Sequence, residues 1–222
     1  MTERVLVVAA HADDEALGCG GAMARHSDNG DTVDVVFVAD GVTGRGDEKL
    51  DERHASALRA CSILGANEPV FLDFPDQKLD TLSFLQIVQA IEPLIQRIGP
   101  TIIYTHHGGD LNLDHRIVHQ AVLTALRPMP SSTYKAIYAF EVSSSTEWAS
   151  SAIGEGFRPD YFVAIETTID RKIEALHAYG QEMRDFPHSR SYDAVRALAV
   201  VRGSSVGLPS AEGFVTLRSI AR

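Results

Sequence analysis

Short apolar runs alternate with amphipathic segments through the first two thirds of the chain. Continuous apolar runs of about four to eight residues predict buried strands, whereas apolar residues spaced about three or four apart predict helices that cover them. On this pattern we expect strands at residues 5–10, 32–39, 70–74, 101–105, 134–142 and 161–165. We expect helices at residues 16–29, 51–64, 84–98, 114–126, 169–183 and 192–201. Pro93 should kink or divide the third of these helices.

This alternation is typical of an α/β fold in which crossover helices connect parallel strands. We therefore predict a Rossmann-like, mostly parallel sheet with helices on both faces. The pattern becomes less regular after residue 126, but no internal repeat or low-complexity linker interrupts the chain. We expect a single domain over residues 1–222, in which the less regular segment 127–222 closes over the functional site.

A histidine and three acidic residues directly follow the first predicted strand, at His11 and residues 13–15. In open α/β sheets, ligands collect beyond the carboxyl ends of the strands, so these side chains stand where chemistry is usually done. The dipole of the next helix would favour the acidic residues in its first turn, but it does not explain His11. Adjacent carboxylates repel one another unless a cation intervenes. Imidazole and carboxylate together suit zinc or another divalent transition metal.

A second polar cluster follows the predicted strand at residues 101–105 and could complete the same site. It contains Asp110, Asn112, Asp114 and His115. His115 is a candidate for the remaining metal ligand, so that two strand ends would share one ion. Asp114 has two interpretations: it accepts a hydrogen bond from a neighbouring imidazole, or it only caps the following helix.

Size and charge exclude several classes of function. The chain has 222 residues, of which 45% are apolar, and a formal net charge of -10. A broad nucleic-acid surface is not expected, because phosphate binding depends on clustered Lys and Arg. The apolar run near the N-terminus is too short for a signal peptide or a spanning helix, so we expect a cytoplasmic protein without membrane association. Cys19 and Cys61 form no CxxC pair and are interpreted as buried small hydrophobic residues.

With both polar clusters in view, the sequence resembles the PIG-L/LmbE-like family of zinc-dependent N-acetyl amino-sugar deacetylases. The resemblance depends on the His-x-Asp-Asp-Glu element at residues 11–15 and the Asp-His element at residues 114–115, each of which follows a strand. A bacterial branch linked to surface-polysaccharide sugars is similar over further segments, at residues 64–65, 75–77, 105–110, 140–148 and 187–191. The resemblance therefore extends over most of the chain.

The resemblance implies a metal-dependent deacetylase with an LmbE-like domain. It implies that Zn²⁺, or another divalent transition metal, is bound by His11, Asp14 and His115, and that Asp13 is the general base. Two positions depart from the family pattern. Ala12 stands where the family often has proline, which removes no ligand, and Asn112 stands where many members carry a histidine three residues before the ligand. Asparagine can donate a hydrogen bond to an oxyanion, but it cannot exchange a proton near neutral pH.

Three protein ligands leave at least one coordination position for water, as in catalytic zinc sites. The ion lowers the pKa of that water toward about 7 and polarises an amide oxygen. We expect Asp13 to accept the proton as the water attacks an acetamide carbonyl, while Asn112 or a loop amide helps the metal to stabilise the oxyanion. Asp13 can then return the proton to the leaving amine. Alternative proton donors are His106, His107 and His188.

Five side chains are candidates for binding the substrate, namely Arg53, Asp110, Glu141, His188 and Arg190. Arg190 is also suited to a phosphate group, because guanidinium matches phosphate geometry. Ordinary surface ion pairing is the alternative for these charged residues. The expected partner is a small N-acetylated sugar or sugar conjugate, and homo-oligomerisation stays open.

Two other functions compete with sugar deacetylation. A non-catalytic nucleotide-binding module would use Gly18, Gly20 and Gly21 after the first strand and Asp40 at the end of the second. The spacing argues against it, since a GxGxxG motif needs glycine where Met23 stands, and the acidic cluster would repel a pyrophosphate. The other alternative keeps the metal but hydrolyses a different N-acyl compound, such as a mycothiol- or bacillithiol-type thiol precursor.

Overall fold

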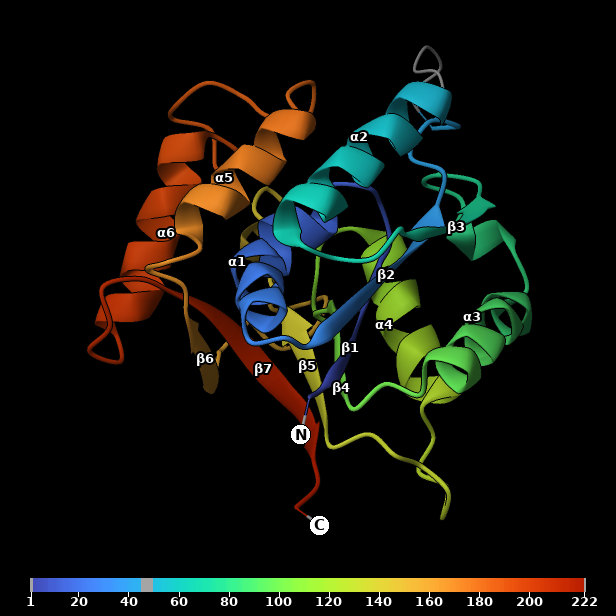
Figure 1. Ribbon diagram of the computed structural model, residues 1–222. Helices are drawn as coiled ribbons and strands as arrows, with labels where there is room; N and C mark the ends of the chain where they lie inside the picture. Colours follow the sequence, from blue (N-terminus) through green and yellow to red (C-terminus); the bar gives the residue numbers. More distant parts are fainter. Residues whose placement is uncertain (1, 45–49, 222) are drawn as a thin grey trace.

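The computed structural model describes residues 2–44 and 50–221. Within these residues, seven strands form one sheet in the order β3-β2-β1-β4-β5-β7-β6 (Figure 1). The strands are β1 (Arg4–Ala9), β2 (Thr32–Ala39), β3 (Val70–Phe74), β4 (Ile102–His106), β5 (Ala136–Phe140), β6 (Tyr161–Ala164) and β7 (Ala211–Ser219). The first five strands pair in parallel, whereas β7 is antiparallel to both of its neighbours. The predicted mostly parallel sheet is confirmed.

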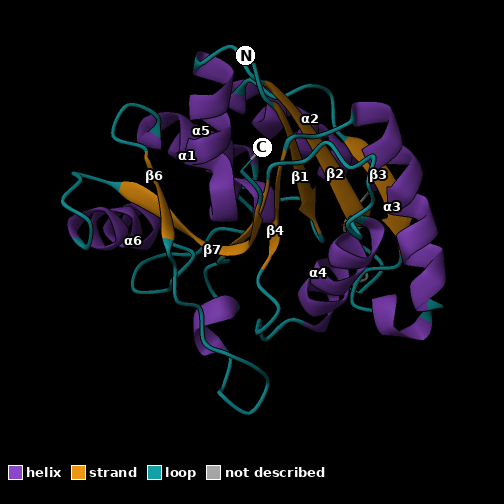
Figure 2. Ribbon diagram, turned by 90° about the horizontal axis from the view of Figure 1, so that it is seen from below, coloured by secondary structure: helices purple, strands orange, loops and turns teal. Residues whose placement is uncertain are grey.

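Helices cover both faces of the sheet, as predicted (Figure 2). One face carries α1 (Asp14–Asp28), α2 (Leu50–Leu64), α5 (Ile169–Ala178) and α6 (Tyr192–Ser204). The other face carries α3 (Phe84–Ile98) and α4 (Leu113–Ala125). Two short 3-10 helices, η1 (Leu79–Thr81) and η2 (Thr146–Trp148), lie in connecting segments. Among the described residues, no helix has the length and apolar character needed to cross a membrane.

The apolar strands are explained by burial on both faces. In β1, Val5 and Val7 pack into the core under α1, whereas Leu6 and Val8 pack into the core under α3 and α4. Successive side chains of a strand point to opposite faces, so a strand between two helical layers needs apolar residues at every position. The same reason accounts for the continuous apolar run of β2.

Three local expectations differ from the structure. Strand β7 was not predicted, and it inserts antiparallel between β5 and β6. Pro93 lies within one continuous α3, whose buried apolar face packs against the sheet and outweighs the loss of one helical hydrogen bond. The helix expected over residues 169–183 ends at Ala178. The glycine-rich sequence after β2 also predicts a flexible loop over residues 40–46, of which residues 45 and 46 lie outside the described residues.

The glycines of α1 allow the helix to pack closely on its neighbours. A Cβ atom at Gly18 would overlap the ring of Phe140, and one at Gly21 would lie 2.7 Å from Ile165. Contacts this short exclude any larger side chain unless the surroundings shift. These glycines therefore serve helix packing, which removes the feature on which the nucleotide-binding alternative depended.

A buried ion pair occupies a break in α1. The helix is interrupted at Cys19, where φ is -144°. The Glu212 carboxylate accepts hydrogen bonds from the freed backbone N–H of Gly21 (2.9 Å) and from that of the next residue (2.7 Å). Lys172 donates from Nζ to Glu212 (2.5 Å) and to the carbonyl of Leu17 (2.7 Å). Lys172 and Glu212, both from the second half of the chain, thus supply hydrogen bonds to the backbone groups of α1 that the break leaves without helical partners.

Candidate metal and catalytic site

The two polar clusters predicted from the sequence meet at the carboxyl ends of β1 and β4. These strands are neighbours in the sheet and run in parallel. The turn after β1 carries His11 and leads into α1, while β4 leads through a polar loop to His115 in the first turn of α4. Connections from the two strands leave toward opposite halves of the sheet, so the site lies at a topological switch point.

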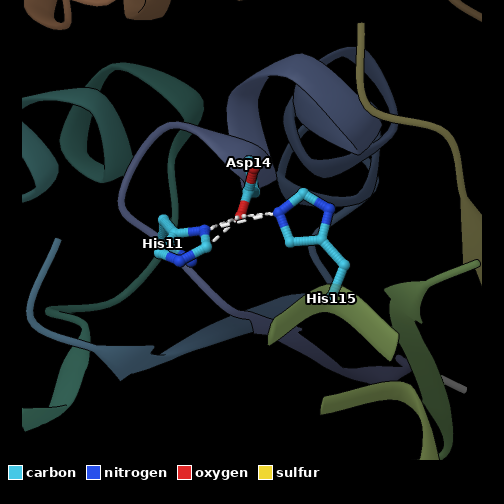
Figure 3. Close-up of side chains that lie close together, drawn as sticks. All are labelled: His11, Asp14 and His115. Atoms are coloured by element: carbon cyan, nitrogen blue, oxygen red, sulfur yellow. Dashed lines mark hydrogen bonds and ion pairs between the residues drawn. The ribbon is translucent and has the colours of Figure 1, made fainter. Parts of the chain in front are cut away.

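Three donor atoms at this point form an equilateral triangle (Figure 3). His11 Nδ1 and His115 Nε2 each lie 3.3 Å from Asp14 Oδ2, and the two nitrogens are 3.3 Å apart. Ligands bound about 2.0–2.1 Å from a zinc ion at the tetrahedral angle are separated by about 3.3 Å. All three side chains are buried, and Asp14 Oδ1 has no hydrogen-bond partner among the described residues. The triangle therefore fits a single divalent ion.

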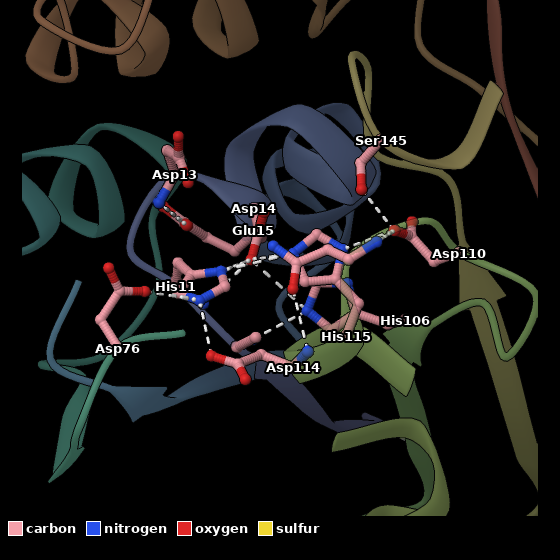
Figure 4. Close-up of polar contacts among 12 residues, drawn as sticks. His11, Asp13, Asp14, Glu15, Asp76, His106, Asp110, Asp114, His115 and Ser145 are labelled. Atoms are coloured by element: carbon pink, nitrogen blue, oxygen red, sulfur yellow. Dashed lines mark hydrogen bonds and ion pairs between the residues drawn. The ribbon is translucent and has the colours of Figure 1, made fainter. Parts of the chain in front are cut away.

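Carboxylates lie behind both imidazoles (Figure 4). His11 Nε2 is 3.0 Å from Asp76 and 3.3 Å from Asp114, and His115 Nδ1 is 3.2 Å from Asp110. A carboxylate on the far nitrogen fixes the tautomer and the ring orientation of a metal-ligating histidine. Each ring thus directs its other nitrogen toward the common centre.

The structure decides between the two interpretations of Asp114. Asn112 is the N-cap of α4, because its side-chain oxygen accepts the backbone N–H of Asp114 (2.9 Å). Asp114 itself accepts the backbone N–H groups of Gln77 (2.9 Å) and Leu79 (3.3 Å) as well as contacting His11. The helix-cap interpretation of Asp114 is therefore wrong, and its carboxylate orients His11 while connecting the segment around η1 to the site.

Asp110 is enclosed by protein donors, which differs from its predicted contact with substrate. Ser145 and Thr146 donate their hydroxyl hydrogens to its two oxygens, and Asn112 donates its backbone N–H at 2.8 Å. Burial alone would raise the pKa of Asp110, but the hydrogen bonds from His115, Ser145 and Thr146 lower it to about 2. This carboxylate contacts His115, and its predicted contact with substrate stays a prediction.

The electrostatics of the triangle favour a cation at its centre. Burial alone would lower the pKa of both histidines, yet the surrounding carboxylates raise that of His11 well above its ordinary value and that of His115 to about 9. Burial alone would raise the pKa of Asp14, but the neighbouring His115 and His106 hold it well below its ordinary value. The cluster thus stabilises positive charge between its donor atoms, which a divalent ion supplies without protonation.

Asp13 adjoins the ligand Asp14 but contacts a different set of side chains. Arg190 Nη1 donates to Asp13 Oδ2 at 2.7 Å, and Arg53 Nη2 lies 3.8 Å from Oδ1. Glu182 completes the group, at 2.6 Å from Arg53 and 3.7 Å from Arg190. Burial raises the pKa of Asp13, while the two guanidinium groups oppose that rise. Its backbone φ of 132° is rare for a residue with a side chain and costs roughly 1–3 kcal/mol.

Glu15, the third acidic residue of the cluster, holds the turn between β1 and α1 by hydrogen bonds. Its carboxylate accepts the backbone N–H of Asp13 at 3.1 Å and the hydroxyl of Tyr179 at 2.7 Å. Burial raises the pKa of Glu15 to about 8. Since its oxygens face these two donors, Glu15 stabilises the unusual backbone of Asp13.

Comparison with known proteins agrees with this geometry. The family model for PIG-L, described as GlcNAc-PI de-N-acetylase, matches residues 6–126, which is more than half of the chain. The chain belongs to the PIG-L family. It is 29% identical to the uncharacterized deacetylase YaiS of Escherichia coli (strain K12), a match that covers 71% of this chain and 84% of that protein.

A second relative of this PIG-L chain carries a substrate in its name. The probable N-acetyl-alpha-D-glucosaminyl L-malate deacetylase 2 of Bacillus cereus is 29% identical, and the match covers 81% of this chain and 83% of that protein. The fold is also that of the 4-carboxy-2-hydroxymuconate hydratase from Pseudomonas putida KT2440, with a TM-score of 0.79 and 22% identity over 100% of this chain and 98% of that one. Because a hydratase has the same fold, the reaction must be argued from the site.

Two of the histidines considered as proton donors are engaged by the backbone in this PIG-L chain. His106 Nε2 accepts the N–H of Ala10 at 2.8 Å, and its ring stacks on His115 at 3.9 Å. Burial lowers the pKa of His106 well below its ordinary value. His107 donates from Nε2 to the carbonyl of Glu155 at 2.9 Å. His106 is therefore a neutral ring packed against the candidate ligand His115, and neither ring is arranged to pass a proton to a substrate through that nitrogen.

Of the remaining predicted substrate contacts, Arg53 lies in α2 and the other three lie in the second half of the chain. Glu141 forms a two-pronged ion pair with Arg202, at 2.7 and 2.6 Å, which gives its carboxylate a structural partner. His188 Nδ1 accepts the backbone N–H of Arg190 at 3.0 Å, and its ring packs edge-on against Trp148. Arg190 and Arg53 lie beside Asp13, as described above. The substrate contacts of these residues stay predictions.

Asp76 is a site residue that the sequence interpretation did not assign. It follows the carboxyl end of β3 and lies 3.0 Å from His11 Nε2. The signal that could have found it is the one that predicts His11 and His115, a polar residue after a predicted strand. Ser145 and Thr146 carried no such signal, because hydroxyl residues are common in loops of every kind.

Proposed function

We propose that this PIG-L chain is a metal-dependent hydrolase that removes the N-acetyl group from an amino sugar or sugar conjugate. The observation that carries the proposal is the triangle of donor atoms on His11, Asp14 and His115, with the buried carboxylate of Asp13 beside it. Zn²⁺ suits two imidazoles and one carboxylate at this spacing. The names of both sequence relatives support deacetylation.

The proposed mechanism assigns the proton transfers to Asp13. A divalent ion held by the triangle supplies a Lewis acid that polarises an amide oxygen and acidifies water. Asp13 accepts a proton as the water oxygen forms a bond to the acetamide carbon, and burial favours that protonated form. When the C–N bond breaks, Asp13 returns the proton to the amine nitrogen. The products are acetate and the free amino sugar.

Asn112 can assist without exchanging a proton. Its side-chain oxygen is used in the helix cap, which leaves the amide N–H₂ group to donate a hydrogen bond to the oxyanion. The engagement of His106 and His107 by the backbone supports Asp13 as the group that carries the proton in both directions.

We further propose that residues 127–222 belong to the same LmbE-like domain and close over the site. Three kinds of contact support this arrangement: hydroxyls of Ser145 and Thr146 on Asp110, the guanidinium of Arg190 on Asp13, and the carboxylate of Glu212 on the backbone of α1. Each contact joins a residue of the second half to a segment that carries a predicted site residue.

Acetate release from a panel of free and nucleotide-linked N-acetyl sugars tests the proposal. We expect acetate and free amine in equal amounts, loss of both with a chelator, and recovery on addition of Zn²⁺. Acetate from an N-acyl thiol precursor but from no polysaccharide-type sugar would support the thiol-precursor alternative. Hydration of an unsaturated acid without acetate release from any substrate would contradict the proposal, as would NAD binding by a protein that retains no metal.

A further inference from the structure

Trp148 is an exposed aromatic side chain on a firmly anchored segment. It is the one tryptophan of the chain, it ends η2, and 53% of its surface is exposed. Its carrier segment is fixed to the site, since Ser145 and Thr146 donate to Asp110. The Glu147 side chain also accepts the backbone N–H of Ser145 at 3.2 Å. Tryptophan is enriched at binding interfaces because its ring combines a large apolar face with a polar N–H group.

His188 places a polar donor beside this ring. The two rings are 5.6 Å apart and almost perpendicular, at 81°. Because His188 Nδ1 accepts the backbone N–H of Arg190, the neutral ring carries its proton on Nε2, the atom that points away from that backbone. Arg190 in turn donates to Asp13. The aromatic ring and the imidazole N–H therefore belong to a surface connected to the proposed base through one residue.

We propose that Trp148 and His188 form a sugar subsite at the mouth of the catalytic site. The apolar C–H face of a pyranose ring packs on the indole, and His188 Nε2–H donates to a ring hydroxyl. This pairing of an apolar face with a directional donor matches the mixed character of a sugar, which has C–H groups on its faces and hydroxyls at its edge. The inference rests on the proposed function, because it assumes an amino-sugar substrate.

Intrinsic fluorescence reports on this subsite directly, because Trp148 is the chain's one tryptophan. We would titrate N-acetylglucosamine and N,N′-diacetylchitobiose into zinc-loaded Asp13→Asn protein, in which turnover is blocked. We expect a saturable change in emission with the cyclic sugars and none with mannitol, an acyclic polyol of similar polarity. Absence of any saturable change at concentrations that saturate the wild-type enzyme would overturn the inference.

Kinetics of matched variants separate binding from a structural role. Trp148→Leu should raise KM by about five- to tenfold with kcat almost unchanged, whereas Trp148→Phe should stay near wild type because it keeps an aromatic face. Phe84→Leu, which removes an exposed ring on α3, serves as the control. His188→Leu should raise KM in the same way, and His188→Gln should restore part of the loss because its amide can donate near the position of Nε2.

The outcomes distinguish this inference from the proposed function. Acetate release by Trp148→Leu with wild-type KM would overturn the subsite and leave the deacetylase proposal intact. A saturable change in emission with sugars, but no acetate from any of them, would contradict the reaction and support the subsite. A fall in kcat at constant KM, shared by the Leu and Phe variants, would assign Trp148 a structural role and also overturn the inference.

Discussion

The two halves of the chain contribute to the site in different ways. The first part, residues 1–126, contains the region matched by the family model at residues 6–126 and supplies His11, Asp14 and His115 from the segments that follow two neighbouring strands. The second half supplies no member of that triangle, but Arg190 reaches Asp13 across 177 residues of sequence. The difference teaches that the reactive atoms come from short local motifs, whereas their orientation depends on contacts that only the folded chain brings together.

The largest effect should come from the reactive half, at Asp13. We expect Asp13→Asn to lower kcat by about 10²–10⁴-fold, because the variant keeps the metal ligands and loses the proton acceptor. Acetate release and elemental analysis of the same sample measure the two properties. His115→Ala is the matched comparison, since it removes a ligand and should lower the metal content itself. Turnover by Asp13→Asn close to that of the wild type would refute the role of the base.

Lys172 tests how strongly the second half supports the first. Lys172→Met leaves the buried Glu212 carboxylate without its cation and should lower the free energy of unfolding by ~3–5 kcal/mol. The double variant Lys172→Met, Glu212→Gln should recover part of this loss, since it removes the uncompensated charge and the amide oxygen still accepts one of the two N–H groups of α1. Urea unfolding of the metal-free proteins measures both. A loss below ~1 kcal/mol in the single variant would show that the break in α1 does not need this ion pair.

Asp110 tests the contact between the halves nearest to the metal. Asp110→Asn should weaken metal binding by about 10–100-fold, because the carboxylate behind a ligating histidine orients the ring and makes it more basic. Thr146→Val, which removes one donor to Asp110, should cause a smaller loss in the same direction. Competition with a chelator measures the affinity, and Asp170→Asn on the exposed surface of α5 is the control. Equal affinity in Asp110→Asn and the control would contradict the orienting role.

The sequence predicts the reactive half of the fold well because its signals are local. The apolar runs of β1, β2 and β4 appear in the sequence as buried strands, and polar residues follow them at the sheet edge. By contrast, β7 carries a charged residue, Glu212, at its second position, followed by a glycine, and it pairs with β5 and β6 through distant contacts. Glu212 is buried because it accepts N–H groups at the break in α1. No local sequence pattern shows that such a charged residue belongs to a strand.

The same distinction applies to the site. The sequence predicts His11, Asp14 and His115 as donors because each belongs to a polar cluster that follows a strand, and the structure brings the three side chains together. Nothing in the sequence says which of the 20 Lys and Arg residues contacts Asp13, and the answer, Arg190, depends on how the second half folds back. The sequence places Asp110 near the site, but its burial behind His115 depends on hydroxyls more than 30 residues away.

The smallest effect should come from Glu141, which tests whether every polar residue of the second half serves the substrate. Its ion pair with Arg202 is partly exposed, so Glu141→Gln should lower the free energy of unfolding by only ~0.5–1 kcal/mol. KM for the amino sugar should stay within about twofold of the wild type, because the carboxylate already faces a guanidinium group. Arg202→Gln should give the same small loss of stability and the same KM. A tenfold rise in KM in Glu141→Gln alone would show that this carboxylate leaves Arg202 to bind the sugar, and it would extend the substrate surface beyond Trp148 and His188.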